Sequence, residues 1–141
     1  MKKINHFQEI GIGIVFNKSG ELLIDQRLEN SSMGGMWEFP GGKKFSDESI
    51  EMTIKRELKE ELGIVVKVGA KLLSFQHTYT NKKLDFTVHL CELKSGEAKP
   101  LASQKILWIF PEKLSNFNFP AANQKIISEL YKHLCIEKKK H

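Results

Sequence analysis

The chain combines two hydrophobic patterns, one with a period of two residues and one with a period near four. Residues 84–93 alternate apolar and polar side chains, which is typical of a strand with one buried face. Residues 9–16 and 21–27 are also strand-like, and the polar turn at 17–20 between them predicts a hairpin. Two further segments are expected to be extended, namely residues 64–78 and 106–110. Together these segments predict a sheet.

Two segments have the helical period. In residues 47–62, aliphatic side chains recur every four residues and form one apolar stripe, made of Ile50, Ile54, Leu58 and Leu62. Ser46 is positioned to cap this helix at its N-terminus, and Gly63 to end it. Residues 121–136 form the second predicted helix, with the core-facing side chains Ile126, Ile127, Leu130 and Leu134. Residues 28–41 are expected to be a loop. This set of elements predicts an α/β or α+β fold.

The length of 141 residues suits one domain with its own core, and we expect that domain to span residues 1–136. Much of the net charge of +5 comes from residues 138–140, all lysine, so residues 137–141 are expected to be a basic, disordered tail. No basic stripe with interleaved aromatic residues suggests a stable complex with nucleic acid. No apolar run is long enough to span a membrane.

The two cysteines, Cys91 and Cys135, lack the spacing of a metal site. This is typical of reduced, buried cysteines in a cytoplasmic protein.

Residues 42–64 carry the strongest chemical signal. On a helix, at about 100° per residue, Glu57, Glu60 and Glu61 share one face. Like charges at this spacing repel, so the cluster predicts a cation that offsets the repulsion. Oxygen ligands suit a hard divalent ion such as Mg²⁺, with Mn²⁺ as the alternative.

The same residues follow the pattern Gly-x5-Glu-x7-Arg-Glu-aliphatic-x-Glu-Glu-x-Gly-aliphatic, from Gly42 to Ile64. Every fixed position is present, so the chain resembles the Nudix hydrolase family. The alternative interpretation is a charged, solvated surface helix. The resemblance implies a Nudix-type α/β/α sandwich around a mixed β-sheet, with catalysis of hydrolysis at a nucleoside diphosphate group.

The resemblance also implies roles for the residues of this pattern. It gives the divalent ion these ligands: Glu57, Glu60, Glu61 and the main chain of Gly41 or Gly42. One of the glutamates, Glu57 or Glu60 among them, would orient or deprotonate the attacking water, and Arg56 would orient a glutamate by a charge-assisted bond. Glu48 would be supporting or structural. For Arg56 and Glu48 the alternative is a plain surface ion pair.

Outside this pattern the chain resembles MutT-like members of the family, which implies hydrolysis of 8-oxo-dGTP to the monophosphate and pyrophosphate. The substrate-binding residues implied are Arg27, Glu38, Phe39, Pro40, Gly41, Phe119 and Asn123. Asn123 would hydrogen-bond the oxidised guanine, or cap the last helix. Phe39 and Phe119 would wall the base, or pack in the core. Arg27 would contact phosphate, or be a surface cation at a strand end.

Two positions depart from the MutT-like pattern. Ala102 stands six residues before Trp108, where those members carry a glutamate, and Ser32 replaces a histidine. The number of metal ions and the identity of the base therefore stay open. Two other functions also stay open: hydrolysis of CTP or a modified dCTP, and non-catalytic recognition of oxidised guanine. The expected partner is a small nucleoside triphosphate, and the expected oligomeric state is a monomer.

Overall fold

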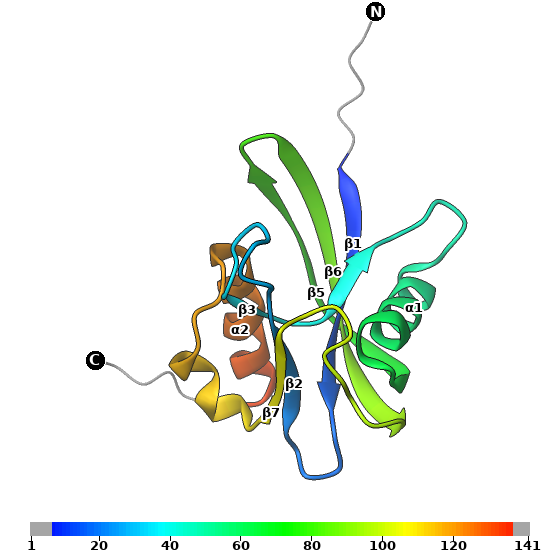
Figure 1. Ribbon diagram of the computed structural model, residues 1–141, viewed down its shortest axis with the longest axis vertical. Helices are drawn as coiled ribbons and strands as arrows, with labels where there is room; N and C mark the ends of the chain where they lie inside the picture. Colours follow the sequence, from blue (N-terminus) through cyan, green and yellow to red (C-terminus); the bar gives the residue numbers. More distant parts are fainter. Residues whose placement is uncertain (1–6, 137–141) are drawn as a thin grey trace, which may run out of the picture.

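The computed structural model describes residues 7–136. A central sheet carries helix α1 on one face and helix α2 on the other (Figure 1). The elements in chain order are β1 Gln8–Phe16, β2 Leu22–Gln26, β3 Trp37–Glu38, β4 Gly41–Lys43, α1 Ile50–Leu62, β5 Val65–Tyr79, β6 Lys82–Ser95, β7 Lys105–Ile109, the 3₁₀ helix η1 Pro111–Asn116 and α2 Ala121–His133. The predicted mixed α/β sandwich is confirmed. The predicted tail at 137–141 lies outside the described residues.

The sheet is mixed, with strands in the order β3-β2-β1-β6-β5 and with β4 and β7 paired to β1 and β2. Strands β1 and β6 run parallel, whereas the other pairs are antiparallel. The predicted β1–β2 hairpin is confirmed. The predicted loop 28–41 was wrong in part, because it contains β3 and the start of β4. These strands have two and three residues, too few to show alternation.

The side chains of the sheet divide between two cores. Leu22 and Ile24 belong to the core under α2, whereas Leu23 belongs to the core under α1. The prediction that Leu134 faces the α2 core was wrong, because the helix ends at His133 and Leu134 is 36% exposed. The prediction of two buried cysteines was also wrong in part, since Cys91 is buried and Cys135 is exposed. No helix within residues 7–136 has the length and apolar content needed to cross a membrane.

Helix α1 lies unusually close to β1 because that strand presents glycines to it. A Cβ on Gly11 or Gly13 would come within 3.1 Å of Ile54. At the C-terminus, Gly63 ends the helix as predicted, with φ of 72° in the left-handed region. At the N-terminus the cap is Ser49, which accepts a hydrogen bond from the Met52 amide. The prediction of Ser46 as cap was therefore wrong, and the helix begins three residues later than expected.

Candidate active site

Arg56, in the middle of α1, is the centre of a hydrogen-bonded network that includes residues just before the helix. Its Nε and Nη2 donate to the two carboxylate oxygens of Glu48, at 2.7 and 2.9 Å. Its Cζ lies 3.9 Å from the ring centre of Phe45, and Nη2 also donates to the Lys43 carbonyl at 2.8 Å. The Arg56 and Glu48 side chains are only 20% and 9% exposed, so this is a partly buried bidentate pair and not a plain surface ion pair.

Both carboxylate oxygens of Glu48 accept hydrogen bonds. Besides Arg56, Glu48 accepts from the Phe45 amide at 2.9 Å and from the Thr53 hydroxyl at 3.0 Å. The Arg56 hydrogen bond, assisted by these two donors, lowers the pKa of Glu48 to about 2. Glu48 is therefore ionised at any physiological pH and holds Arg56 in one orientation.

Arg56 also connects to the glutamates of the predicted ion site. Its Nη1 donates to Glu57 at 2.8 Å and to Glu60 at 3.2 Å. Glu57 lies against Gly42, where any Cβ would clash with the Glu57 carboxylate. A glycine at this position thus lets the β4 backbone reach the carboxylate. Burial raises the pKa of Glu57, although Arg56 opposes the shift.

Glu61, unlike Glu48 and Glu57, has no hydrogen bond from Arg56 among the described residues. Its Oε1 atom is buried and has no hydrogen-bond partner among the described residues. Burial, followed by the nearby charges of Glu57 and Glu38, raises the pKa of Glu61 to about 8. A buried carboxylate oxygen without a donor is costly unless a cation or a proton reaches it.

The oxygen donors at this edge fit a hard divalent ion. Glu57 and Glu61 supply carboxylate oxygens, and the main chain of β4 lies against Glu57 at Gly42 and hydrogen-bonds Glu61 at Gly41. Glu60 is 59% exposed and is turned to Arg56. Within residues 7–136, no three acidic, histidine or cysteine side chains are grouped as a preformed set of metal ligands. The structure therefore brings Glu57 and Glu61 to one edge and leaves Glu60 at its margin.

A third buried acid, Asp25, was not anticipated from the sequence. It lies on β2 directly opposite Glu38 of β3, and it is only 6% exposed. Burial, followed by the charge of Glu38, raises the pKa of Asp25 well above its ordinary value. The available signal was an aspartate at the end of the apolar run Leu22-Leu23-Ile24, a position where a strand usually buries a hydrophobic side chain.

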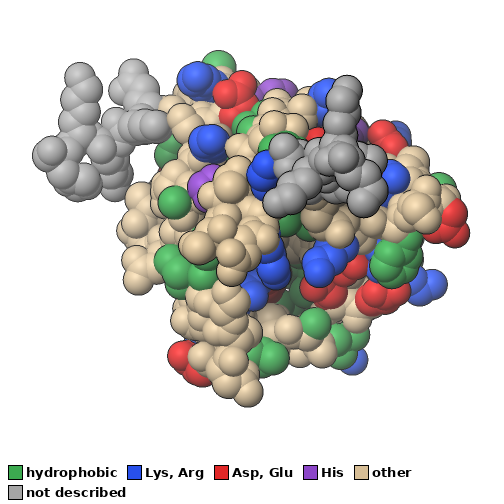
Figure 2. Space-filling model, turned by 90° about the horizontal axis from the view of Figure 1, so that it is seen from above, with side chains coloured by type: hydrophobic (Ala, Val, Ile, Leu, Met, Phe, Trp, Pro, Cys, Tyr) green, Lys and Arg blue, Asp and Glu red, His purple; other side chains and the backbone are tan. Residues whose placement is uncertain are grey.

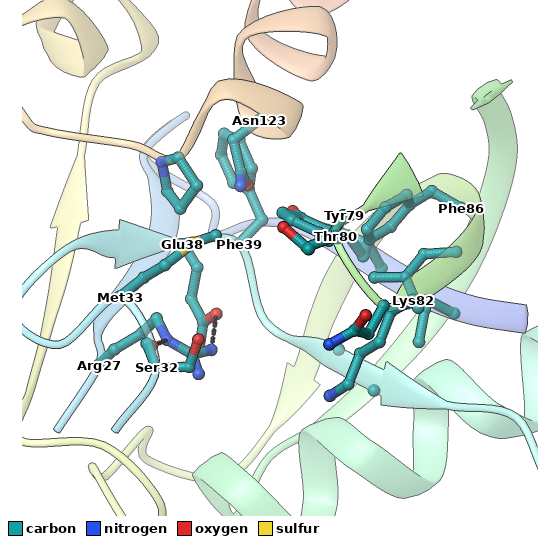
Figure 3. Close-up of a pocket in the computed structure, with 17 residues that line it drawn as sticks. Arg27, Ser32, Met33, Glu38, Phe39, Tyr79, Thr80, Lys82, Phe86 and Asn123 are labelled. Atoms are coloured by element: carbon teal, nitrogen blue, oxygen red, sulfur yellow. Dashed lines mark hydrogen bonds and ion pairs between the residues drawn. The ribbon is translucent and has the colours of Figure 1, made fainter. Parts of the chain in front are cut away.

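A pocket of about 470 Å³ adjoins the glutamate edge (Figure 3). Seen from above, the surface is hollowed at a place bordered by both basic and acidic side chains (Figure 2). The pocket is lined by Ile10, Ile12, Arg27, Ser32, Met33, Glu38, Phe39, Gly41, Gly42, Tyr79, Thr80, Asn81, Lys82, Leu84, Phe86, Pro120 and Asn123. Because Gly42 lines the pocket and also touches Glu57, strand β4 joins the pocket to the glutamates.

The two predicted base-walling phenylalanines have different positions. Phe39 lines the pocket, whereas Phe119 does not; the two rings stack with centroids 5.2 Å apart. Phe119 is 5% exposed and thus packs in the core behind Phe39. Pro40 also lies outside the pocket: it is buried, and its carbonyl accepts a hydrogen bond from the Gly13 amide at 3.0 Å.

Asn123 lies in the first turn of α2 and faces the pocket beside Phe39 (Figure 3). The alternative interpretation of Asn123 as the helix cap was wrong, because the helix begins at Ala121 and its cap position is Pro120. An amide in this position is available to a ligand in the pocket.

The opposite rim of the pocket carries Arg27. Its Nη1 donates to Glu38 at 2.9 Å, and its Nε donates to the Ser32 carbonyl at 2.7 Å. Both side chains of the Arg27–Glu38 pair are about one-third exposed. The β5–β6 turn closes another side with residues that sequence reasoning missed, namely Tyr79, Thr80, Asn81 and Lys82. Nothing in their local pattern distinguishes them from an ordinary turn.

The NUDIX domain profile matches residues 11–129, which is most of the chain. The chain belongs to the Nudix family. The prediction from the Gly42–Ile64 pattern is confirmed, and the protein is a Nudix hydrolase.

Individual relatives agree with this assignment. The 8-oxo-dGTP diphosphatase of Haemophilus influenzae is 35% identical over 122 residues, covering 86% of this chain and 90% of the relative. The CTP pyrophosphohydrolase of Escherichia coli is 30% identical over 112 residues, covering 79% and 83%. The crystal structure of the MutT protein from Methanosarcina mazei superposes with a TM-score of 0.81 at 26% identity, covering 91% of this chain and 95% of that one. The Nudix fold therefore extends over nearly the whole chain.

Proposed function

We propose that this Nudix hydrolase converts a nucleoside triphosphate into the monophosphate and pyrophosphate, with 8-oxo-dGTP as its preferred substrate and Mg²⁺ as its ion. The observation that carries the proposal is the double role of strand β4. One side of Gly42 touches the Glu57 carboxylate, and Gly42 and its neighbour Gly41 also line the pocket. A nucleotide whose base fills the pocket would thus lay its phosphates along β4 toward the glutamates.

The ion would be held by Glu57, Glu61 and the main chain of β4. When bound, a divalent ion neutralises phosphate charge and lowers the pKa of the attacking water. Arg56 holds the Glu57 carboxylate in place by its 2.8 Å hydrogen bond. Glu57 and Glu60, which share the Arg56 Nη1 donor, are the carboxylates proposed to accept the proton of that water.

Recognition of the base would depend on Asn123 and Phe39. A side-chain amide can donate and accept at once, so it can pair with the edge of an oxidised purine. Phe39 offers an apolar wall, and the volume of about 470 Å³ is in the range of small-ligand pockets. Since Arg27 is already bound to Glu38, we propose that this pair shapes the rim of the pocket, with Arg27 free to turn toward phosphate.

A second candidate function is hydrolysis of CTP or a modified dCTP. It is supported by the relative named CTP pyrophosphohydrolase at 30% identity. The Asn123 amide would serve a pyrimidine edge as well. Non-catalytic recognition of oxidised guanine has less support, because a binding module has no use for a Glu61 carboxylate with one buried oxygen that lacks a partner among the described residues.

The test is pyrophosphate release from 8-oxo-dGTP, dGTP, CTP and 5-methyl-dCTP, each with Mg²⁺ and with EDTA. We expect the highest kcat/KM for 8-oxo-dGTP, no turnover in EDTA and recovery when Mg²⁺ is added in excess. A preference for the pyrimidine nucleotides would support the second candidate. Full turnover in EDTA would contradict both.

Substitution Asn123→Ala tests the role of the amide. We expect the preference for 8-oxo-dGTP over dGTP to fall by about 1–3 kcal/mol in the ratio of kcat/KM values. Thermal stability should hardly change, since Asn123 is not the helix cap. The exposed neighbour Gln124→Ala is the matched control. An unchanged selectivity ratio in Asn123→Ala would exclude Asn123 from base recognition.

A further inference from the structure

Asp25 points to the same side of the sheet as the glutamate edge. Along β2, Leu22 and Ile24 face the α2 core, and Leu23 faces the α1 core. Because side chains alternate along a strand, Asp25 faces α1, as Leu23 does. Its partner across the strand pair is Glu38, so both side chains stand on one face.

The surroundings of Asp25 are acidic and poor in donors. The carboxyl is 6% exposed, its side-chain hydrogen-bond partner is another acid, Glu38, and Glu61 is close enough to interact with it electrostatically. Arg27, the nearby cation, is bound to Glu38 and to the Ser32 carbonyl. Independently, Oε1 of Glu61 is buried with no partner among the described residues.

The loop after β6 has no carboxylate beside its residue Leu101, which contacts the main chain of Glu61. Its Leu101 amide donates to the Glu61 carbonyl at 3.1 Å, which holds the loop against the end of α1. The next residue is Ala102, whose methyl group cannot be a ligand. A buried carboxylate that lies close enough to Glu61 to interact with it comes from the sheet, and it is Asp25.

We propose that Asp25 is an additional ligand of the divalent ion, which it shares with Glu61. The inference rests on the proposed metal-dependent function and deepens it. Two like-charged acids opposite each other destabilise a strand pair, and a bound cation reverses that effect. In the competing explanation, Asp25 is a neutral acid that only hydrogen-bonds Glu38. Asparagine can perform that role, but it is a far poorer ligand for a hard cation.

The experiment measures Mn²⁺ binding to the nucleotide-free full-length chain by electron paramagnetic resonance, with free Mn²⁺ as the signal. Three variants are compared with wild type: Asp25→Asn, Asp25→Val and the control Asp85→Asn. Asp85 lies on β6, where it pairs with β1 and β5, away from Asp25. The valine variant continues the apolar run Leu22-Leu23-Ile24 and suits a strand, so it provides a second folded test if the asparagine variant is unstable.

We expect both Asp25 variants to bind Mn²⁺ at least about tenfold more weakly than wild type, which corresponds to about 1.4 kcal/mol. Asp85→Asn should bind as wild type does. Wild-type affinity in either folded Asp25 variant would overturn the proposal while leaving the proposed function intact. No Mn²⁺ binding by the wild type would overturn both.

Discussion

Two acid-rich regions lie side by side at α1, and they differ in how their carboxylates are satisfied. In the Arg56 network, formed with Glu48, Glu57 and Glu60, one guanidinium donates to all three carboxylates. In the Asp25 group, formed by Asp25, Glu38 and Glu61, the buried Asp25 faces the partly exposed Glu38, and one carboxylate oxygen of Glu61 has no partner among the described residues. Donor supply, and not the number of acids, thus separates carboxylates held by a guanidinium from carboxylates left open to a cation, and Glu57 lies where the two regions meet.

The largest expected effect concerns Glu61. Glu61→Gln removes the charge that holds the ion, so turnover should fall by about 10²–10³, or about 3–4 kcal/mol in the barrier. In the metal-free protein, Glu61 must take up a proton on folding, which costs free energy at neutral pH, so the melting temperature of the glutamine variant should be higher than that of wild type. Steady-state kinetics and calorimetry measure the two effects. Glu51→Gln, an exposed acid on the same helix, is the control and should change neither.

If Glu61→Gln kept wild-type turnover, the Asp25 group would have no part in catalysis. Glu57→Gln should also lose turnover, but without the gain in stability, because Glu57 has Arg56 as a partner.

Arg56→Ala should act in the opposite direction on stability. It leaves Glu48, which is 9% exposed, without its main partner, so the free energy of unfolding should fall by more than in Arg27→Ala. Arg27→Ala removes a more exposed pair and should cost about 1 kcal/mol or less. Urea denaturation compares the two. If the two variants lost the same free energy of unfolding, the Arg56 network would stabilise the fold no more than a surface ion pair does.

The sequence was informative about the Arg56 network and uninformative about the Asp25 group. The residues of the Gly42–Ile64 pattern lie within one helix and the segment just before it, so their spacing alone predicts which side chains meet. Even there, the predicted cap Ser46 was wrong, because Ser49 caps the helix and the start of the helix depends on where Glu48 is held.

The Asp25 group could not be predicted because its members come from three elements that only the fold brings together. Asp25 and Glu38 meet through the pairing of β2 with β3, and β3 has only two residues. Phe39 and Asn123 are likewise brought together only by the fold, because their shared pocket depends on how α2 packs on the sheet. The family pattern predicted these two residues as substrate-binding, but local sequence did not distinguish Phe39 from its core neighbour Phe119.

The smallest expected effect is the pH dependence of stability in the metal-free protein. The pKa of Glu48 is lowered from 4.5 to about 2 in the folded state, so its stabilisation is present above pH 4.5 and is lost as the pH falls toward 2. The pKa of Glu61 is raised from 4.5 to about 8, so its contribution is complete below pH 4.5 and is lost as the pH rises toward 8.

The melting temperature of wild type should therefore decline on both sides of a maximum near pH 4.5–5. Glu61→Gln should make the alkaline decline less steep, with the remainder due to the raised pKa values of Asp25 and Glu57, and should leave the acid side unchanged. Thermal scans from pH 3 to pH 9 in EDTA would show this. An alkaline decline that is equally steep in Glu61→Gln would mean that Glu61 is ionised in the folded protein at neutral pH.

The most direct test of the account is a crystal structure with Mn²⁺, with the ion located by its anomalous scattering. The account predicts a peak at the edge where Glu57, Glu61 and the main chain of β4 meet, within reach of Asp25, and no peak between Arg56 and Glu48. An ion bound by Glu48, or a fully occupied ion that leaves Glu61 unligated, would contradict it.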